Sequence, residues 1–424
     1  MINKLNLKKL NFPIFLLTIL PISIVLGSSI SLINVVLLGL LFFPEYLKNA
    51  NIRIYGKKVL ITFTILYIYL LFNSLISIDY SSGIFRNVGF IRFILFFLIT
   101  NLIFYNLDNN NILKVWTFIF LLIVIDIYVE RITGSNILGY GKVQIDGIFQ
   151  PHGPRVVSFF KTEPIAGAFV TGFVFIILGF LFESFKKEKD ILKIFVVLIL
   201  LFSLIGILIT GERSNTIKAL IGTLLFFLLS DFLKWKTKII SLIIFLTLFS
   251  ITIYSSDYLK NRYVGQIFQK LKTEENRKKF KEESLYFKLY KSGISVFKNY
   301  TILGVGNKNY RIESCDEKKN RVYKDYYCLT HPHQVYIEFL SEHGIFGTAI
   351  ILSTIFYLLF RILRQIILSQ NHIQIGSFVF ILINFIPLLP SGSFFSDFNL
   401  TLFMINFSLV YAVNKETNIF HKKK

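Results

Sequence analysis

Runs of apolar residues close to the thickness of a lipid bilayer constrain this chain more than any other feature. Two of these runs cover residues 59–78 and 191–209. At a rise of about 1.5 Å per residue, a helix of this length crosses a hydrocarbon core about 30 Å thick. Only 17% of the 424 residues are charged, whereas a soluble domain carries about 25%. The sequence therefore predicts an all-α, polytopic integral membrane protein.

The apolar runs predict about twelve transmembrane helices. We expect them near residues 10–27, 30–44, 58–78, 84–106, 112–130, 164–184, 191–210, 215–232, 238–255, 343–366, 372–391 and 396–414. The first run follows a basic start and resembles a signal peptide. A second apolar run follows at once, which favours an uncleaved first helix.

The positions of Lys and Arg indicate the orientation of these helices. With a cytoplasmic N-terminus, basic clusters fall inside at residues 48–58, 186–193, 234–238, 361–364 and 415–424. The short external turns at residues 27–29, 77–83 and 390–397 then hold no Lys or Arg. This distribution follows the positive-inside rule. Because much of the Lys has this orienting role, we expect no nucleic-acid partner despite a net charge of +21.

Two segments that fall outside are basic, and they divide the chain into three parts. Residues 1–255 hold nine helices and a periplasmic loop at residues 131–163. Residues 256–342 form a large periplasmic loop domain, long enough to escape the positive-inside rule. Residues 343–424 hold the last three helices and a cytoplasmic tail.

The only two cysteines, Cys315 and Cys328, both fall in the large loop. A disulfide between them is typical of an oxidising periplasm. Two free thiols are the alternative, because spacing alone does not define a bridge.

Several charged residues lie near the predicted external ends of helices, where a bilayer makes charge costly. They are Arg86, Arg92, Arg155, Lys161, Glu212, Arg213 and Lys218. Snorkelling to the interface would explain any one of them alone. All of them except Arg92 are expected at about the same depth in the membrane, however, which indicates a functional site.

Arg213 is the strongest candidate, because it lies in Thr-Gly-Glu-Arg-Ser-Asn at residues 210–215, between two apolar helices. A guanidinium at a helix N-terminus forms an anion site suited to phosphate. Arg155 would enter the same space from another loop.

Four of the six histidines also fall on the external side, namely His152, His331, His333 and His343. We expect no metal site, because His331 and His333 lie two residues apart on a proline turn without nearby acidic residues. The Gly-Val-Gly at residues 304–306 lacks a βαβ context, which favours a tight turn over a nucleotide site.

These motifs resemble the O-antigen ligase and polymerase superfamily of bacterial inner membranes. The most specific parts are Leu-Gly-Val-Gly at residues 303–306, the run His-Pro-His-Gln-x-Tyr-x-Glu-x-Leu-x-Glu-x-Gly-x-x-Gly from His331, and Gly-Glu-Arg-Ser at residues 211–214. The chain has Gln334 where the family usually has Asn. It has Tyr286 or a neighbour where an Arg commonly precedes the glycine turn.

The resemblance implies transfer of a glycan from a polyprenyl-diphosphate carrier to an acceptor sugar hydroxyl on the periplasmic face. The acceptor would be lipid A–core, membrane lipid would surround the protein, and the reaction would invert the anomeric centre without metal or cofactor. His333, with His331, would be the base. The substrate-binding residues would be Arg213, Arg155, Arg86, Glu212 and Gln334.

Two other functions fit the sequence. A polymerase that joins repeat units has the same motifs as a ligase. A flippase or exporter of lipid-linked glycans would also be helical and basic inside, but it should show internal repeats, which the sequence lacks.

Overall fold

The computed structural model describes residues 11–48, 52–106, 110–141, 144–145, 148–149, 155–186, 188, 190–266, 272–276, 282 and 284–422. These residues are helical apart from turns and one antiparallel hairpin of β1 (Gln144–Ile145) and β2 (Ile148–Phe149). The all-α prediction is therefore confirmed. His152, one of the predicted external histidines, lies outside the described residues.

The described residues form the following helices, in chain order. They are α1 (Asn11–Thr18), α2 (Leu20–Leu26), α3 (Ser28–Lys48), α4 (Lys57–Leu75), α5 (Tyr80–Gly89), α6 (Ile91–Asn106), α7 (Asn110–Thr133), the 3-10 helix η2 (Ser158–Phe160), α8 (Ala166–Ser184), α9 (Asp190–Ile209), α10 (Arg213–Leu229), α11 (Trp235–Tyr254), α12 (Asp257–Lys260), the π-helix η3 (Asn261–Gly265), α15 (Leu285–Asn299), α16 (Tyr310–Ser314), α17 (Glu317–Val322), α18 (Val335–Ser369), α19 (His372–Asn384) and α20 (Asp397–Ala412).

Every range predicted as a transmembrane helix contains a helix, but not all of these helices have the length of a bilayer span. Eight stretches are long and apolar enough to cross a membrane: α3, α4, Tyr80–Asn106 (α5 with α6), α7, α8, α9, α11 and α18. The first predicted helix is divided into α1 and α2, and Pro21 lies in the first turn of α2. Helices α10, α19 and α20 have 17, 13 and 16 residues. The described residues thus support a polytopic membrane protein with eight candidate spans, whereas the sequence predicted about twelve.

Helix α18 begins eight residues before the start predicted from the sequence, at Val335 rather than residue 343. Its first turn is capped by Gln334, whose side-chain oxygen accepts the N–H of Ile337 at 2.9 Å. A glycine at position 344 breaks the helical dihedral angles inside the element, with φ 62° and ψ −169°. The apolar run located the part of α18 that follows the kink, and the helical spacing of Val335, Phe339 and Glu342 indicated the shorter part before it.

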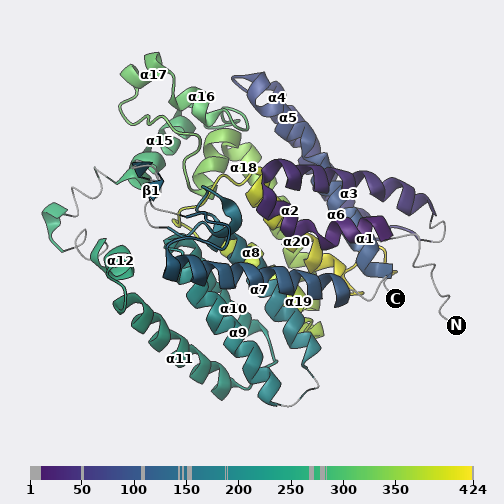
Figure 1. The fold of residues 1–424 in the computed structure, drawn as a ribbon. Coiled ribbons are helices and arrows are strands. Elements are labelled where there is room, and N and C mark those ends of the chain that lie inside the picture. The colour runs from purple at the N-terminus through teal and green to yellow at the C-terminus, as the bar shows by residue number, and fades with distance from the viewer. Residues whose placement is uncertain are drawn as a thin grey trace.

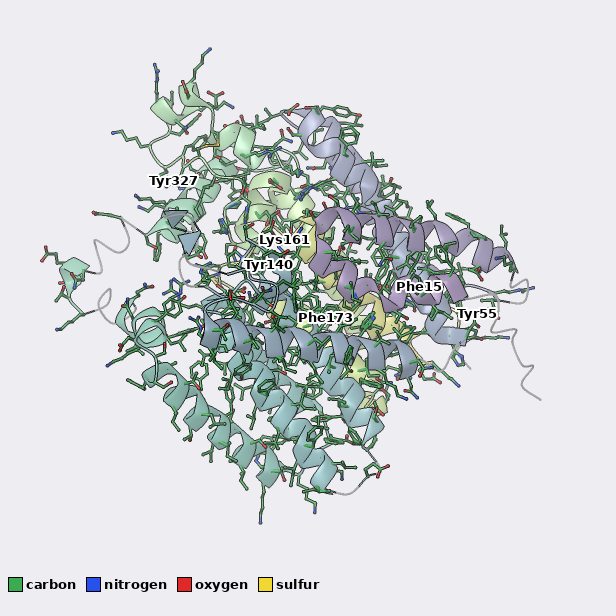
Figure 2. The ribbon with its side chains drawn as sticks, viewed as in Figure 1. Phe15, Tyr55, Tyr140, Lys161, Phe173 and Tyr327 are labelled. Atoms are coloured by element: carbon green, nitrogen blue, oxygen red, sulfur yellow. A yellow bond between two sulfur atoms is a disulfide. The ribbon has the colours of Figure 1, made fainter. Side chains whose placement is uncertain are left out.

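Helix α8 lies at the centre of the bundle, and nearly all of its residues are buried. It packs against α7, α9 and α19, and Figure 2 shows Phe173 of α8 in the middle of the molecule. A Cβ added at Gly376 of α19 would lie 2.0 Å from the carbonyl oxygen of Phe175. Small residues at such crossings allow membrane helices to approach backbone to backbone.

We call the described residues between α11 and α18 the loop domain. Figure 1 shows α15, α16 and α17 together at one end of the bundle, beside the start of α18. Cys315, directly after α16, forms a disulfide with Cys328, with Cα atoms 4.4 Å apart. The bridge ties α16 to the segment that leads to His331.

The orientation of the chain can be tested with two fusions of alkaline phosphatase, which is active only in the periplasm. A fusion inserted after the exposed Lys324 of the loop domain should be active. A fusion after residue 424 should be inactive, because the basic tail marks the cytoplasmic side. Strong activity of the second fusion would reverse the whole topology.

Candidate functional site

A cavity of about 1180 Å³ lies between the loop domain and the helix bundle. Its walls come from the bundle helices α5, α8, α10, α18, α19 and α20, from η3, α15 and α16 of the loop domain, and from segments between these elements. Six predicted site residues line it: Arg86, Arg155, Glu212, Arg213, His331 and His333. Gln334 does not line the cavity, because its side chain caps α18. These six residues come from four distant parts of the sequence and meet in one space.

Arg155 enters the cavity from a segment that α7 holds by buried carboxylates. Glu130 accepts the backbone N–H groups of Val157 at 2.9 Å and Ser158 at 2.5 Å. Asp126 accepts the Ser158 hydroxyl at 2.5 Å. The Nε of Arg155 itself is buried and makes no hydrogen bond within the described part of the chain. This backbone support places Arg155 in the cavity wall with one buried donor that no described residue satisfies.

Arg213 is the first residue of α10, as expected for an anion site at a helix N-terminus. The preceding Glu212 accepts the N–H of Gly167 at 2.6 Å and a side-chain N–H of Asn215 at 2.6 Å. Burial raises the pKa of the Glu212 carboxyl to about 7, against the smaller effects of these hydrogen bonds and of nearby Arg155. Glu212 therefore joins the starts of α8 and α10 and leaves the Arg213 guanidinium facing the cavity.

Arg262 of η3 completes a cluster of three guanidinium groups with Arg155 and Arg213. Its Nε donates to the carbonyl of Gly211 at 3.1 Å, and its own carbonyl accepts from Arg213 at 3.5 Å. Burial and then the charges of Arg155 and Arg213 lower the pKa of Arg262. We call these three residues the arginine cluster. Like charges disfavour one another, so an anion bound among these three groups would be stabilised.

The two predicted histidines form a second feature of the cavity. Their ring centroids lie 3.9 Å apart, and Tyr286 meets the His333 ring edge to face at 6.1 Å. The Nδ1 of His331 lies 3.0 Å from the Thr330 hydroxyl. The Nε2 of His331 is buried without a hydrogen-bond partner among the described residues.

Both imidazoles are held in the neutral form. Burial lowers the pKa of His331 to about 3, with a further contribution from His333. Burial also lowers the pKa of His333. His333 has φ 55°, a left-handed conformation that costs a non-glycine residue about 1 kcal/mol or more. Its carbonyl accepts the N–H of Ser391 at 2.9 Å, which ties the histidine segment to the α19–α20 loop.

A carboxylate of α18 holds the same α19–α20 loop from the other side. Glu338 accepts the Ser393 hydroxyl at 2.6 Å and the N–H of Phe394 at 3.0 Å. Glu338 is itself buried. The loop and the histidine segment are therefore fixed relative to each other by three hydrogen bonds.

The glycine turn at residues 303–306 packs on the kink of α18. Gly304 and Gly306 have φ of 72° and 98°, which confirms the predicted tight turn. The N–H of Val305 donates to the backbone carbonyl of Ser341 at 3.0 Å, and that of Gly306 donates to the backbone carbonyl of Glu342 at 2.9 Å. A Cβ at Gly344 would lie 2.3 Å from the carbonyl oxygen of Ile302. Only glycine fits at this crossing.

Past this turn, a network of asparagines joins the loop domain to the membrane helices. Asn307 donates its backbone N–H to Asn73 of α4 at 2.9 Å and its side chain to Asn87 of α5 at 2.6 Å. Asn309 accepts the N–H of Asp79 at 2.7 Å. The network places Lys308 beside Arg86 in the cavity wall.

Sequence reasoning missed several residues of the cavity. Arg262, Lys308 and Arg311 lie in a segment so rich in Lys and Arg that no single cation stood out. Lys218 was noted as an unusual charge, and the structure shows its Nζ donating to Asn384 at 3.1 Å in the cavity wall. Within the described ranges, no group of three or more His, Cys, Asp and Glu could hold a metal ion.

These features define an integral membrane protein with a cationic cavity beside a pair of neutral histidines. Residues 197–352 match the family model described as O-antigen ligase. The match runs from α9 into α18 and includes the segments with Arg213, His331 and His333. This match supports the predicted membership of the O-antigen ligase and polymerase superfamily. No curated protein gives a significant match to the chain.

The crossing of the glycine turn and α18 can be tested with a pair of alanine variants. Gly344→Ala combines a left-handed backbone, costing about 1–2 kcal/mol, with overlap onto a neighbouring backbone. Gly134→Ala has φ 82° but no atom within 4 Å of the added Cβ, so it has the backbone cost alone. Gly344→Ala should lower the unfolding temperature of the detergent-solubilised protein much more than Gly134→Ala. Equal shifts would contradict the close packing at the kink.

Proposed function

We propose that the protein is a glycosyltransferase that moves a glycan from a polyprenyl-diphosphate carrier to an acceptor hydroxyl. The observation that carries this proposal is the position of the arginine cluster and the two histidines in one cavity. The match to the O-antigen ligase family narrows the substrates to lipid-linked glycans and their acceptors. We further propose that the cavity faces the periplasm and that the protein resides in the inner membrane.

The arginine cluster suits the diphosphate of the donor. As the glycosidic C–O bond breaks, the electron pair moves to the diphosphate, whose charge grows in the transition state. Guanidinium groups fixed before the reaction stabilise that charge without reorganisation, and more strongly in a partly desolvated cavity. Arg213 at the N-terminus of α10 adds the backbone N–H groups of that helix end.

The histidine pair suits the acceptor. The acceptor oxygen forms a bond to the anomeric carbon, and its proton passes to a neutral imidazole. A neutral ring with a free nitrogen can accept this proton. One displacement of this kind inverts the anomeric centre, and the residues present provide for it without a metal or cofactor.

We propose lipid A–core as the acceptor, which makes the protein a ligase; the family match supports ligase and polymerase alike. Deletion of the gene, followed by electrophoresis of the surface polysaccharide, distinguishes them. Loss of all polymer-capped core supports the ligase. Core that carries a single repeat unit supports a polymerase instead, and unchanged polysaccharide would refute both.

Arg213 can be tested by two substitutions. Arg213→Ala should reduce transfer by about 10²–10³-fold, the effect typical of one lost transition-state donor. Arg213→Lys keeps the charge but loses the two-pronged geometry and should retain partial activity. Arg321→Ala, at an exposed site of α17 away from the cavity, is the matched control and should be fully active. Normal transfer by Arg213→Ala would remove this residue from the site.

The base can be tested in the same assay. We expect His333 to be the base, so His333→Ala should lose about 10²–10⁴-fold and His331→Ala much less. Because burial lowers the pKa of His333, its neutral form persists below the ordinary histidine value of about 6.5. Wild-type activity should therefore hold as the pH falls through 6.5 and decline only at lower pH. EDTA should have no effect; equal loss in both variants with rescue by zinc would indicate a metal site instead.

A further inference from the structure

The cavity contains a second group of cations, separate from the arginine cluster. This group lines the wall that the asparagine network holds. It consists of Arg86 in α5, Lys308 just before α16, and Arg311 in α16. Burial and then the charges of Arg86 and Arg311 lower the pKa of Lys308, which places the three charges close together. We call these residues the rim cluster, because Arg311 is exposed at the opening whereas Arg86 and Lys308 are half-buried.

Three carboxylates act favourably on the rim cluster: Asp397, Glu342 and Glu338 on Arg86, and the first two also on Lys308. Each of them also has another partner. Asp397 pairs with Arg92 at 2.5 Å. Glu338 is bound to the α19–α20 loop. Glu342 accepts the backbone N–H of Tyr310 at 3.4 Å.

The cations themselves are left with few partners. Among the described residues, the side chains of Lys308 and Arg311 make no hydrogen bond or ion pair, and a guanidinium nitrogen of Arg86 donates to the carbonyl of Phe395. Unpaired cations in a partly buried wall are favourable when an anion binds there.

The position of the rim cluster separates it from the proposed donor site. The arginine cluster is built by the start of α10, by η3 and by the segment at Arg155. The rim cluster is built by α5 and the segment that leads into α16, and Arg86 acts electrostatically on His331. An anion bound at the rim would therefore lie on the histidine side of the cavity, where the acceptor hydroxyl must be.

We propose that Arg86, Lys308 and Arg311 bind an acidic substituent, a phosphate or a carboxylate, on the acceptor glycan. This inference rests on the proposed function, since it assigns the second substrate of the same cavity. An acidic group held at the rim would orient the acceptor so that one hydroxyl lies at the histidine pair. Acceptors without an acidic group would bind more weakly and react more slowly at low concentration.

The number of anion sites tests the proposal directly. Inorganic pyrophosphate is titrated calorimetrically into the full-length protein in detergent, and the wild type should bind it at two sites. The double variant Lys308→Gln/Arg311→Gln should weaken one site by about tenfold or more, as expected for lost charge-assisted hydrogen bonds. Arg213→Ala should weaken the other site. A single site in the wild type, or two unchanged sites in the double variant, would overturn the proposal.

Competition identifies the chemistry of the ligand. D-Glucose 6-phosphate and D-glucuronate should displace pyrophosphate from the rim site better than uncharged D-glucose, and the stronger of the two indicates phosphate or carboxylate. Equal, weak displacement by all three would refute recognition of an acidic sugar.

A transfer assay separates this inference from the proposed function. The double variant should raise the KM for the acceptor while the KM for the donor stays unchanged. Loss of transfer in Arg213→Ala with an unchanged acceptor KM in the double variant would refute the rim site alone. Unchanged transfer in Arg213→Ala would refute the donor assignment, while two-site pyrophosphate binding would still support the rim site.

Discussion

The cavity depends on buried carboxylates that accept backbone N–H groups from segments far away in the sequence. Glu130 holds the segment of Arg155, Glu212 joins the starts of α8 and α10, and Glu338 holds the α19–α20 loop. Each carboxylate satisfies donors that would be costly to bury alone. These carboxylates bind mainly backbone groups, and Glu212 and Glu338 also act electrostatically on Arg155 and Arg86. This division of roles leaves positive charge available to a ligand in a partly buried space.

The two cation clusters and the histidines occupy different parts of the cavity. The arginine cluster lies where α10 begins, and the rim cluster lies at the opening toward the loop domain. The neutral histidines share the wall of the rim cluster. In the proposed reaction, charge grows at the leaving group and a proton departs from the acceptor. The structure provides fixed positive charge for the first event and an uncharged ring for the second.

The sequence predicted the helices and part of the cavity because those features are local. Apolar runs of bilayer length predict membrane helices by themselves, and Arg213 and Arg155 were found because a cation beside an apolar run is unusual. Arg262, Lys308 and Arg311 carry no such contrast in a segment rich in basic residues. The part of α18 before the kink lies outside the apolar run that predicted the span, and its first turn depends on the Gln334 cap. The roles of Gly344 and of Asn307 depend on contacts with partners distant in the sequence, which no local pattern contains.

The disulfide between Cys315 and Cys328 helps to hold two walls of the cavity together. The bridge lies between Arg311 on one side and His331 on the other, so it joins the rim wall to the histidine segment through the backbone. Such a bond persists only in an oxidising compartment. A copy inserted with its loop domain toward a reducing cytosol would therefore keep two thiols, and these two walls would be joined by weaker contacts alone. The oxidation state of one bond would thus mark whether a given molecule had reached the side of the membrane where its site is complete.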